Sequence, residues 1–183
     1  VILTTQDRTR GAFLETSRLE PSAAWNPGAV RIDAFPVLLR GRILNPQGAP
    51  CAGAMVTVRP WGRAGRVETT RANQDTGSFV LRGAPFSGPL LVTAFHEGLA
   101  GRLQTQVAHG TDSMLTLQLA PPGRISGTVD AASALVERGV TVNAVLPGVR
   151  DSRAAIHASH VERDGSFELL GVAAGIYDIL VVA

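Results

Sequence analysis

The chain has 183 residues, of which 45% are hydrophobic and 17% are charged, and its formal net charge is +2 at pH 7. This composition is typical of a globular protein with a buried core and excludes a disordered chain. The net charge is too small to indicate a nucleic-acid partner. No apolar run approaches the roughly 20 residues of a membrane helix. We therefore expect neither nucleic-acid binding nor membrane insertion.

Two residue types limit the chemistry further. All 17 basic residues are arginine, so Schiff-base chemistry, a phosphate-loop lysine and Lys–Asn isopeptide cross-links are excluded. The single cysteine, Cys51, excludes a disulfide within the chain. The first residue is Val1 rather than Met, from which we expect a processed or excised segment.

Alternation of apolar and polar residues dominates the chain and predicts β-strands. At the N-terminus it predicts strands over 2–5, 10–14 and 29–32. In the middle of the chain it predicts strands over 39–44, 54–59, 66–72, 78–82, 90–94, 102–107 and 115–119. Turn residues separate these segments, and no helical period interrupts them. The seven short strands in the middle of the chain predict an all-β sandwich. We expect one core between its two sheets, formed by Ile43, Val56, Val58, Phe79, Leu81, Val92 and Leu117.

The stretch 41–94 is repeated in looser form over 127–181. Gly41 aligns with Gly127, and the run Asp75-Thr76-Gly77-Ser78-Phe79 aligns with Asp164-Gly165-Ser166-Phe167. A period of about 86 residues is too long for a solenoid repeat and suits a small domain in a tandem array. Such arrays usually space or display other domains.

Proline and glycine locate the module boundaries, since 120–123 reads Ala-Pro-Pro-Gly and forms a stiff linker. We predict that residues 1–36 are the C-terminal half of an upstream β-sandwich module, 37–121 a complete module and 122–183 the N-terminal portion of a following module. An N-terminal extension is the alternative for 1–36. Incomplete modules leave open sheet edges, which we expect to pair with neighbouring modules of the same protein or with another copy of the chain.

The motifs of both copies resemble those of the carboxypeptidase regulatory-like domain family. They are Gly-x-(Ile/Val) at 41–43 and 127–129, Gly-Ala-x-Val-x-Val at 53–58, Asp-x-Gly-x-Phe-x-Leu at 75–81 and Gly-x-Tyr-x-Ile-x-Val at 175–181. Leu90 stands where the family usually has an aromatic residue. The resemblance implies tandem seven-stranded Greek-key β-sandwich modules of prealbumin-like fold. It also implies non-catalytic domains, found in secreted arrays or appended to metallocarboxypeptidases and outer-membrane receptors.

One motif has the letters of a catalytic signature. Asp75-Thr76-Gly77-Ser78 matches the aspartic protease motif, in which two aspartates share a proton. The residues before it are polar, however, and Asp-x-Gly is also an ordinary hairpin turn, which is our interpretation here. Cys51 has no histidine near it in sequence, so we interpret it as an inert thiol rather than a nucleophile.

Two further patterns in the sequence suggest a metal site. His157 and His160 fall on a predicted strand, where residues three apart face opposite sides. Glu162 and Asp164 beside Gly165 provide too few oxygens for calcium. His96 and His109 are expected in loops. We predict no metal site and no cofactor.

Trp61 is the strongest candidate for a ligand contact. It lies between Arg59 and Arg63, and a flat ring beside guanidinium donors can stack on a sugar or hold an acidic group. The alternative, which we favour, is that Trp61 covers the open end of its own sandwich. Trp25 is interpreted in the same way.

Together these observations predict a non-catalytic structural or spacer module of a tandem β-sandwich array. The expected location is extracytoplasmic, in a secreted, periplasmic or cell-surface bacterial protein. The alternatives are a carbohydrate- or protein-binding module, or a regulatory appendage of a metallocarboxypeptidase or an outer-membrane receptor.

Overall fold

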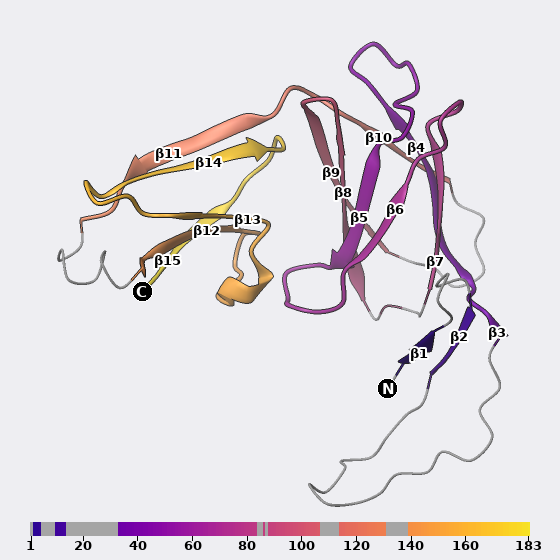
Figure 1. Ribbon diagram of the computed structural model, residues 1–183, viewed down its shortest axis with the longest axis horizontal. Coiled ribbons are helices and arrows are strands. Elements are labelled where there is room, and N and C mark those ends of the chain that lie inside the picture. Colours follow the sequence, from indigo (N-terminus) through magenta and orange to yellow (C-terminus); the bar gives the residue numbers. More distant parts are fainter. Residues whose placement is uncertain are drawn as a thin grey trace, which may run out of the picture.

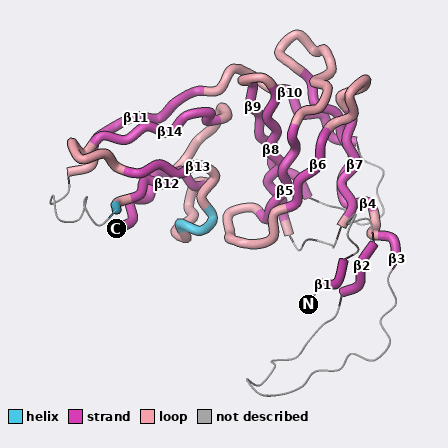
Figure 2. The backbone as a smooth tube through the Cα atoms, viewed as in Figure 1, coloured by secondary structure: helices cyan, strands magenta, loops and turns pink. Residues whose placement is uncertain are grey.

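The computed structural model describes residues 2–4, 10–13, 33–83, 86, 88–106, 114–130 and 139–183. The prediction of an all-β protein is confirmed for these residues, which form strands β1 to β15 and one 3-10 turn (Figures 1 and 2). Near the N-terminus, β1 (Ile2–Thr4), β2 (Arg10–Phe13) and β3 (Asp33–Ala34) form a small antiparallel sheet. Trp25, His109 and most of the range 1–36 lie outside the described residues.

The middle of the chain forms two sheets, which we call the first unit. One sheet has the order β10-β4-β7, with β10 parallel to β4, and the other has the order β6-β5-β8-β9. The strands are β4 (Val37–Leu44), β5 (Met55–Pro60), β6 (Glu68–Arg71), β7 (Ser78–Arg82), β8 (Pro89–His96), β9 (Leu99–Gln106) and β10 (Met114–Gln118). They coincide closely with the strands predicted from alternation. His96 ends β8 instead of lying in a loop, because the apolar alternation of that strand continues to it.

One hydrophobic core lies between these two sheets, an arrangement consistent with a β-sandwich. The side chains predicted to form it are all buried together: Ile43, Val56, Val58, Phe79, Leu81, Val92 and Leu117. They come from strands of both sheets, and each strand contributes alternate residues because successive side chains point to opposite faces. Burial of this apolar surface is the main favourable term in the stability of the unit.

The repeated glycine of the first strand makes room for the repeated phenylalanine. Gly41 pairs with Phe79 across β4 and β7. A Cβ on Gly41 would lie 2.6 Å from Phe79 Cε1 and 2.7 Å from the backbone oxygen of Leu115. Gly127 pairs with Phe167 in the second copy, where an added Cβ would lie 2.9 Å from Phe167 Cε1. The two motifs of the repeat are therefore one packing arrangement, in which an aromatic ring lies over a bare backbone.

The second unit comprises β11 (Gly123–Thr128), β12 (Thr141–Val145), η1 (Ser152–Ala154), β13 (His157–His160), β14 (Ser166–Val172) and β15 (Asp178–Val182). β11 pairs with β14, and a second sheet has the order β13-β12-β15. Its core contains Val140, Val142, Ala144, Leu169 and Val172. Figure 1 shows the two units side by side, joined where the chain passes from β10 to β11.

The structure corrects our interpretation of the Asp-Gly turns as hairpins. The turn containing Asp75 and Gly77 joins β6 to β7, which belong to different sheets, and the turn at Gly165 likewise joins β13 to β14. Gly77 and Gly165 both have positive φ, as turns of this kind require. A tight turn looks the same in sequence whether the next strand pairs with the last one or crosses the core.

Candidate functional site

The outer face of the four-stranded sheet of the first unit carries the residues from which the site is built. Alternation along β5 places Val56 and Val58 in the core and therefore Thr57 and Arg59 on the opposite face. Strand register then places Thr57, Thr93 and Arg102 side by side on β5, β8 and β9. This face is not open to solvent throughout, because the second unit packs against part of it.

A third hydrophobic cluster joins the two units. Trp61 and Leu91 of the first unit pack against apolar side chains between the end of β12 and the end of η1 in the second unit, namely Val145, Leu146, Val149 and Ala154. The approach is close, since a Cβ added to Gly62 would lie 3.1 Å from Val149 Cγ2. Figure 2 shows the η1 turn next to the loop between β5 and β6. The contact is a packed interface between the units.

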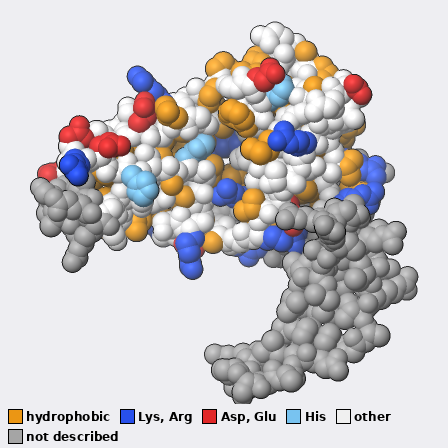
Figure 3. Space-filling model, viewed as in Figure 1, with side chains coloured by type: hydrophobic (Ala, Val, Ile, Leu, Met, Phe, Trp, Pro, Cys, Tyr) orange, Lys and Arg blue, Asp and Glu red, His pale blue; other side chains and the backbone are white. Residues whose placement is uncertain are grey.

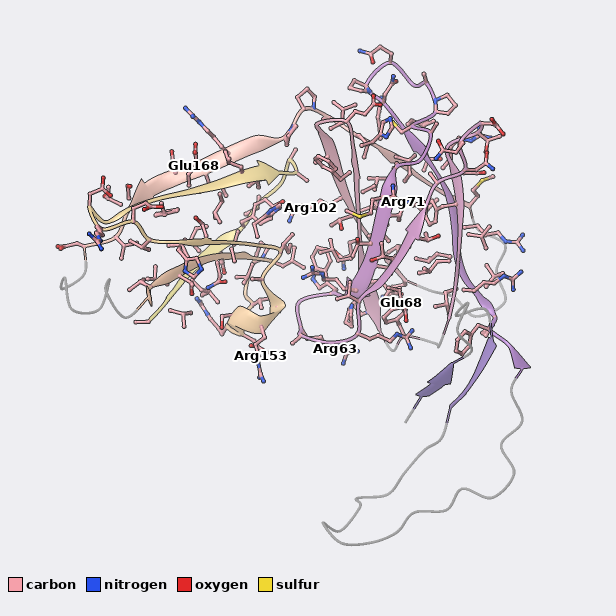
Figure 4. All side chains as sticks on the ribbon, in the orientation of Figure 1. Arg63, Glu68, Arg71, Arg102, Arg153 and Glu168 are labelled. Carbon is pink, nitrogen blue, oxygen red and sulfur yellow. The ribbon has the colours of Figure 1, made fainter. Side chains whose placement is uncertain are left out.

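Two arginines of the first unit bond to backbone carbonyls of the second. Arg59 Nη1 donates to the oxygen of Ala155 at 2.7 Å, and Arg102 Nη2 donates to the oxygen of Ile176 at 3.0 Å. The Arg102 guanidinium also lies over the ring of Tyr177, 4.1 Å from its centroid. Gly175 permits this position, because a Cβ there would overlap the Arg102 guanidinium. Figure 4 shows Arg102 at the boundary between the units.

A cavity of about 180 Å³ lies between the units, next to these arginines. Its basic lining residues are Arg59, Arg102 and His157, and no described residue that lines it is acidic. Its apolar wall includes Met55 and Phe95, which are 43% and 46% exposed. The cavity therefore combines positive charge with hydrophobic surface that is still accessible.

The electrostatics of the cavity follow from burial and from like charges. Burial lowers the pKa of the Arg59 guanidinium. The pKa of His157 is lowered by burial first and then by the positive charges of Arg59 and Arg102, so its imidazole is neutral at pH 7. Burial raises the pKa of Tyr177, whose hydroxyl donates to the oxygen of Ala173 at 2.7 Å.

The predicted ligand-contact residues occupy three different places. Arg59 lines the cavity, while Arg63 is exposed on the loop after β5 and does not line it. We expected Trp61 to cover the end of its own sandwich. In the structure it packs in the cluster between the two units instead.

The other sequence candidates lie apart from one another. Asp75 is in an exposed turn, and Cys51 is buried in the core, which raises the pKa of its thiol. His157 is half-buried at the cavity and His160 is exposed, as expected for opposite sides of a strand. Within the described ranges there is no group of three or more His, Cys, Asp or Glu residues that could hold a metal ion.

Sequence reasoning missed Arg102 and Tyr177 as residues of a site. The sequence places Arg102 on a predicted strand and Tyr177 in the repeat motif. Alternation indicates on which face of the sheet Arg102 lies, but not which part of the chain covers that face.

No protein-family model and no curated protein sequence matches the chain. In the part of the chain that the structure describes, no helix is long and apolar enough to span a membrane.

Proposed function

We propose that this chain is a non-catalytic structural and spacer segment of a tandem β-sandwich array in a secreted or cell-surface bacterial protein. The proposed modules are seven-stranded Greek-key sandwiches of the carboxypeptidase regulatory-like, prealbumin-like type. A spacer holds its neighbours at a set distance and angle, and it therefore needs a firm joint between modules. The observation that carries the proposal is the packed junction, with Trp61 in an apolar cluster and arginine bonds from β5 and β9 to the second unit.

The charge distribution supports a role in spacing over a role in binding nucleic acid. On the face seen in Figure 3, basic, acidic and hydrophobic side chains are interspersed. Binding to a nucleic-acid backbone requires a clustered basic patch. This distribution is compatible with the proposed extracytoplasmic array, in which each module contacts its neighbours and solvent.

Partners in such an array would join through sheet edges. Strand β15 pairs only with β12 among the described strands, and its side chains Ile179 and Val181 are 40% and 51% exposed. An unpaired edge with apolar side chains favours addition of another strand. We propose that a neighbouring module of the same protein, or a second copy of the chain, supplies it.

The proposal is tested by measuring whether the two units move as one body. We expect backbone ¹⁵N relaxation to give the same rotational correlation time for both units. The double variant Arg59→Ala/Arg102→Ala should separate the two values, because it removes both bonds across the junction. The variant Arg124→Ala is the control, since Arg124 is exposed and bonds to Glu168 within the second unit. Independent tumbling of the two units in the parent protein would refute a spacer function.

Binding of a carbohydrate or protein ligand is the second candidate function. The observation that favours it is the cavity between the units, which has basic side chains, no acidic lining residue among those described, and the exposed side chains of Met55 and Phe95. A regulatory appendage of a metallocarboxypeptidase or outer-membrane receptor would use the same fold.

A further inference from the structure

Two half-buried arginines at the junction have guanidinium nitrogens that the described residues leave without a partner. Arg59 Nε and Arg102 Nη1 are both buried and have no hydrogen-bond partner among the described residues, although each side chain makes one bond to a carbonyl of the second unit. Leaving a charged donor buried without a partner costs more than leaving a neutral one, and native proteins seldom do so. Both side chains line the same cavity, so the positive charges of both lie beside one space.

The positive charges around the cavity favour the binding of an anion. Arg59 and Arg102 both lie near enough to His157 to lower its pKa by repulsion, and no described lining residue supplies a compensating carboxylate. Like charges held together in partly dry surroundings oppose each other, and one negative group between them reverses the sign of that interaction. The backbone carbonyls of Ala155 and Ile176 compensate only in part, because they are dipoles rather than charges.

We propose that this cavity binds a carboxylate group that carries an adjoining apolar portion, a ligand class that deepens the binding function named above as the second candidate. Planar guanidinium donors match a planar carboxylate. The apolar portion would lie against Met55, Phe95 and Tyr177. A phosphate dianion fits less well, because its charge of about −2 is harder to bury beside an apolar wall than the single charge of a carboxylate.

The size of the cavity limits the ligand to a small group. A volume of about 180 Å³ is below the roughly 300 Å³ of typical ligand pockets. It suits one side chain or one small organic acid, such as a carboxylate two or three bonds from a ring. The partly exposed Met55 and Phe95 leave the mouth open to the rest of a larger molecule.

The proposal is tested with 3-phenylpropionate as the probe and its neutral amide, 3-phenylpropionamide, as the matched control. Titration into the ¹⁵N-labelled full chain should shift the Arg Nε resonances of Arg59 and Arg102 to saturation, with a dissociation constant of about 1 mM or below. Arg102→Gln should weaken binding by about tenfold or more, since it removes a charged donor. Arg124→Gln, which changes an exposed arginine outside the cavity, should leave binding unchanged.

A second variant separates loss of the site from loss of the fold. Thr93 lines the cavity and lies directly opposite Arg102 on the neighbouring strand. Thr93→Glu should place a carboxylate of the protein's own beside the guanidinium groups. We expect it to raise the melting temperature and abolish probe binding together, which an unfolded variant cannot do. Thr93→Gln, of the same size without the charge, should retain measurable binding.

Protonation of His157 gives an independent readout. The groups that face it are Arg59, Arg102 and Tyr177, and none of them is negative. A bound carboxylate should therefore raise the pKa of His157, and by linkage the probe should bind more tightly as the pH falls toward that pKa. Absence of saturable binding, equal binding of the amide, or equal binding of inorganic phosphate would each overturn the proposal. None of these outcomes bears on the relaxation test of the spacer function.

Discussion

Strands β8 and β15 occupy corresponding places in the two copies of the repeat, yet their side chains are buried very differently. In β8, Leu90, Val92 and Ala94 face the core and are almost completely buried. In β15, Ile179 and Val181 pair with Ala144 and Val142, which are core residues, but remain 40% and 51% exposed. Similar apolar sequences in similar sheet positions therefore give different burial.

The difference lies in what surrounds each strand. β9 continues the sheet beyond β8, and β10 adds to the facing sheet beside β4. Among the described residues, neither β15 nor β11 has such a neighbour on its outer side. Apolar surface contributes to stability only when it is removed from water, so the first unit gains more from the same repeat than the second does. The comparison teaches that a sequence repeat specifies which segments form strands. The strands packed beside them determine how much each one contributes to the stability of its unit.

The phenylalanine shared by the two copies gives the largest expected difference. Phe79 is 3% exposed in a core built from both sheets, whereas Phe167 is only partly buried. Phe79→Ala should cost about 3–5 kcal/mol of unfolding free energy. Phe167→Ala should cost less, about 1–3 kcal/mol. Urea denaturation followed by circular dichroism measures both.

The control for this pair is Val80→Ala, because Val80 is next to Phe79 but 47% exposed. It should change the free energy of unfolding by less than about 1 kcal/mol. Equal losses for Phe79→Ala and Phe167→Ala would show that the two cores are equally dense, and the contrast drawn from β8 and β15 would then be wrong.

Substitution of the glycine shared by the two copies should also cost more in the first unit than in the second, with smaller effects than those at the phenylalanine. Gly41→Ala places a Cβ against both the Phe79 ring and the backbone of β10, and we expect a loss of about 1–3 kcal/mol. Gly127→Ala meets only the Phe167 ring, which is partly buried rather than enclosed in the core, so its loss should be below about 1 kcal/mol. Gly123→Ala is the control, since its nearest neighbour would be the oxygen of Val172 at 3.8 Å. A larger loss for Gly127→Ala than for Gly41→Ala would contradict the packing described here.

The sequence was sufficient to predict the strands and the core of the first unit, but not the junction. Alternation specifies which residues face inward, and Ile43, Val56, Phe79 and Leu117 are buried as predicted. It does not specify what covers the outer face of a sheet, so Arg102 could not be distinguished from any solvent-facing strand residue. The apolar partners of Trp61 begin at Val145, far along the chain, and no local pattern connects them.

The smallest expected effect concerns the aspartates of the repeated turn, which align in sequence but have different roles. In the second copy, Asp164 Oδ1 accepts from the backbone nitrogen of Ser166 at 2.9 Å and from its hydroxyl at 2.6 Å. In the first copy, Asn73 Oδ1 is the acceptor, from the backbone nitrogens of Asp75 and Thr76 at 2.9 and 3.1 Å. The hydrogen bonds to Ser166 lower the pKa of Asp164 below its ordinary value of 3.8.

Removing the two carboxylates should therefore have unequal consequences. Because the pKa of Asp164 is lower in the folded state, its contribution to stability is present above pH 3.8 and is lost as the pH falls through the folded value. Asp164→Ala should lower the melting temperature at pH 7 and reduce the loss of stability on acidification, while Asp164→Asn keeps the acceptor and loses only its charge.

Asp75→Asn should change the free energy of unfolding by less than about 1 kcal/mol, because the backbone nitrogens of that turn donate to Asn73 and not to Asp75. Thermal melts between pH 2 and 7 distinguish these cases: a large loss in Asp75→Asn, or acid-dependent proteolysis that this variant abolishes, would show that Asp75 does more than occupy a turn.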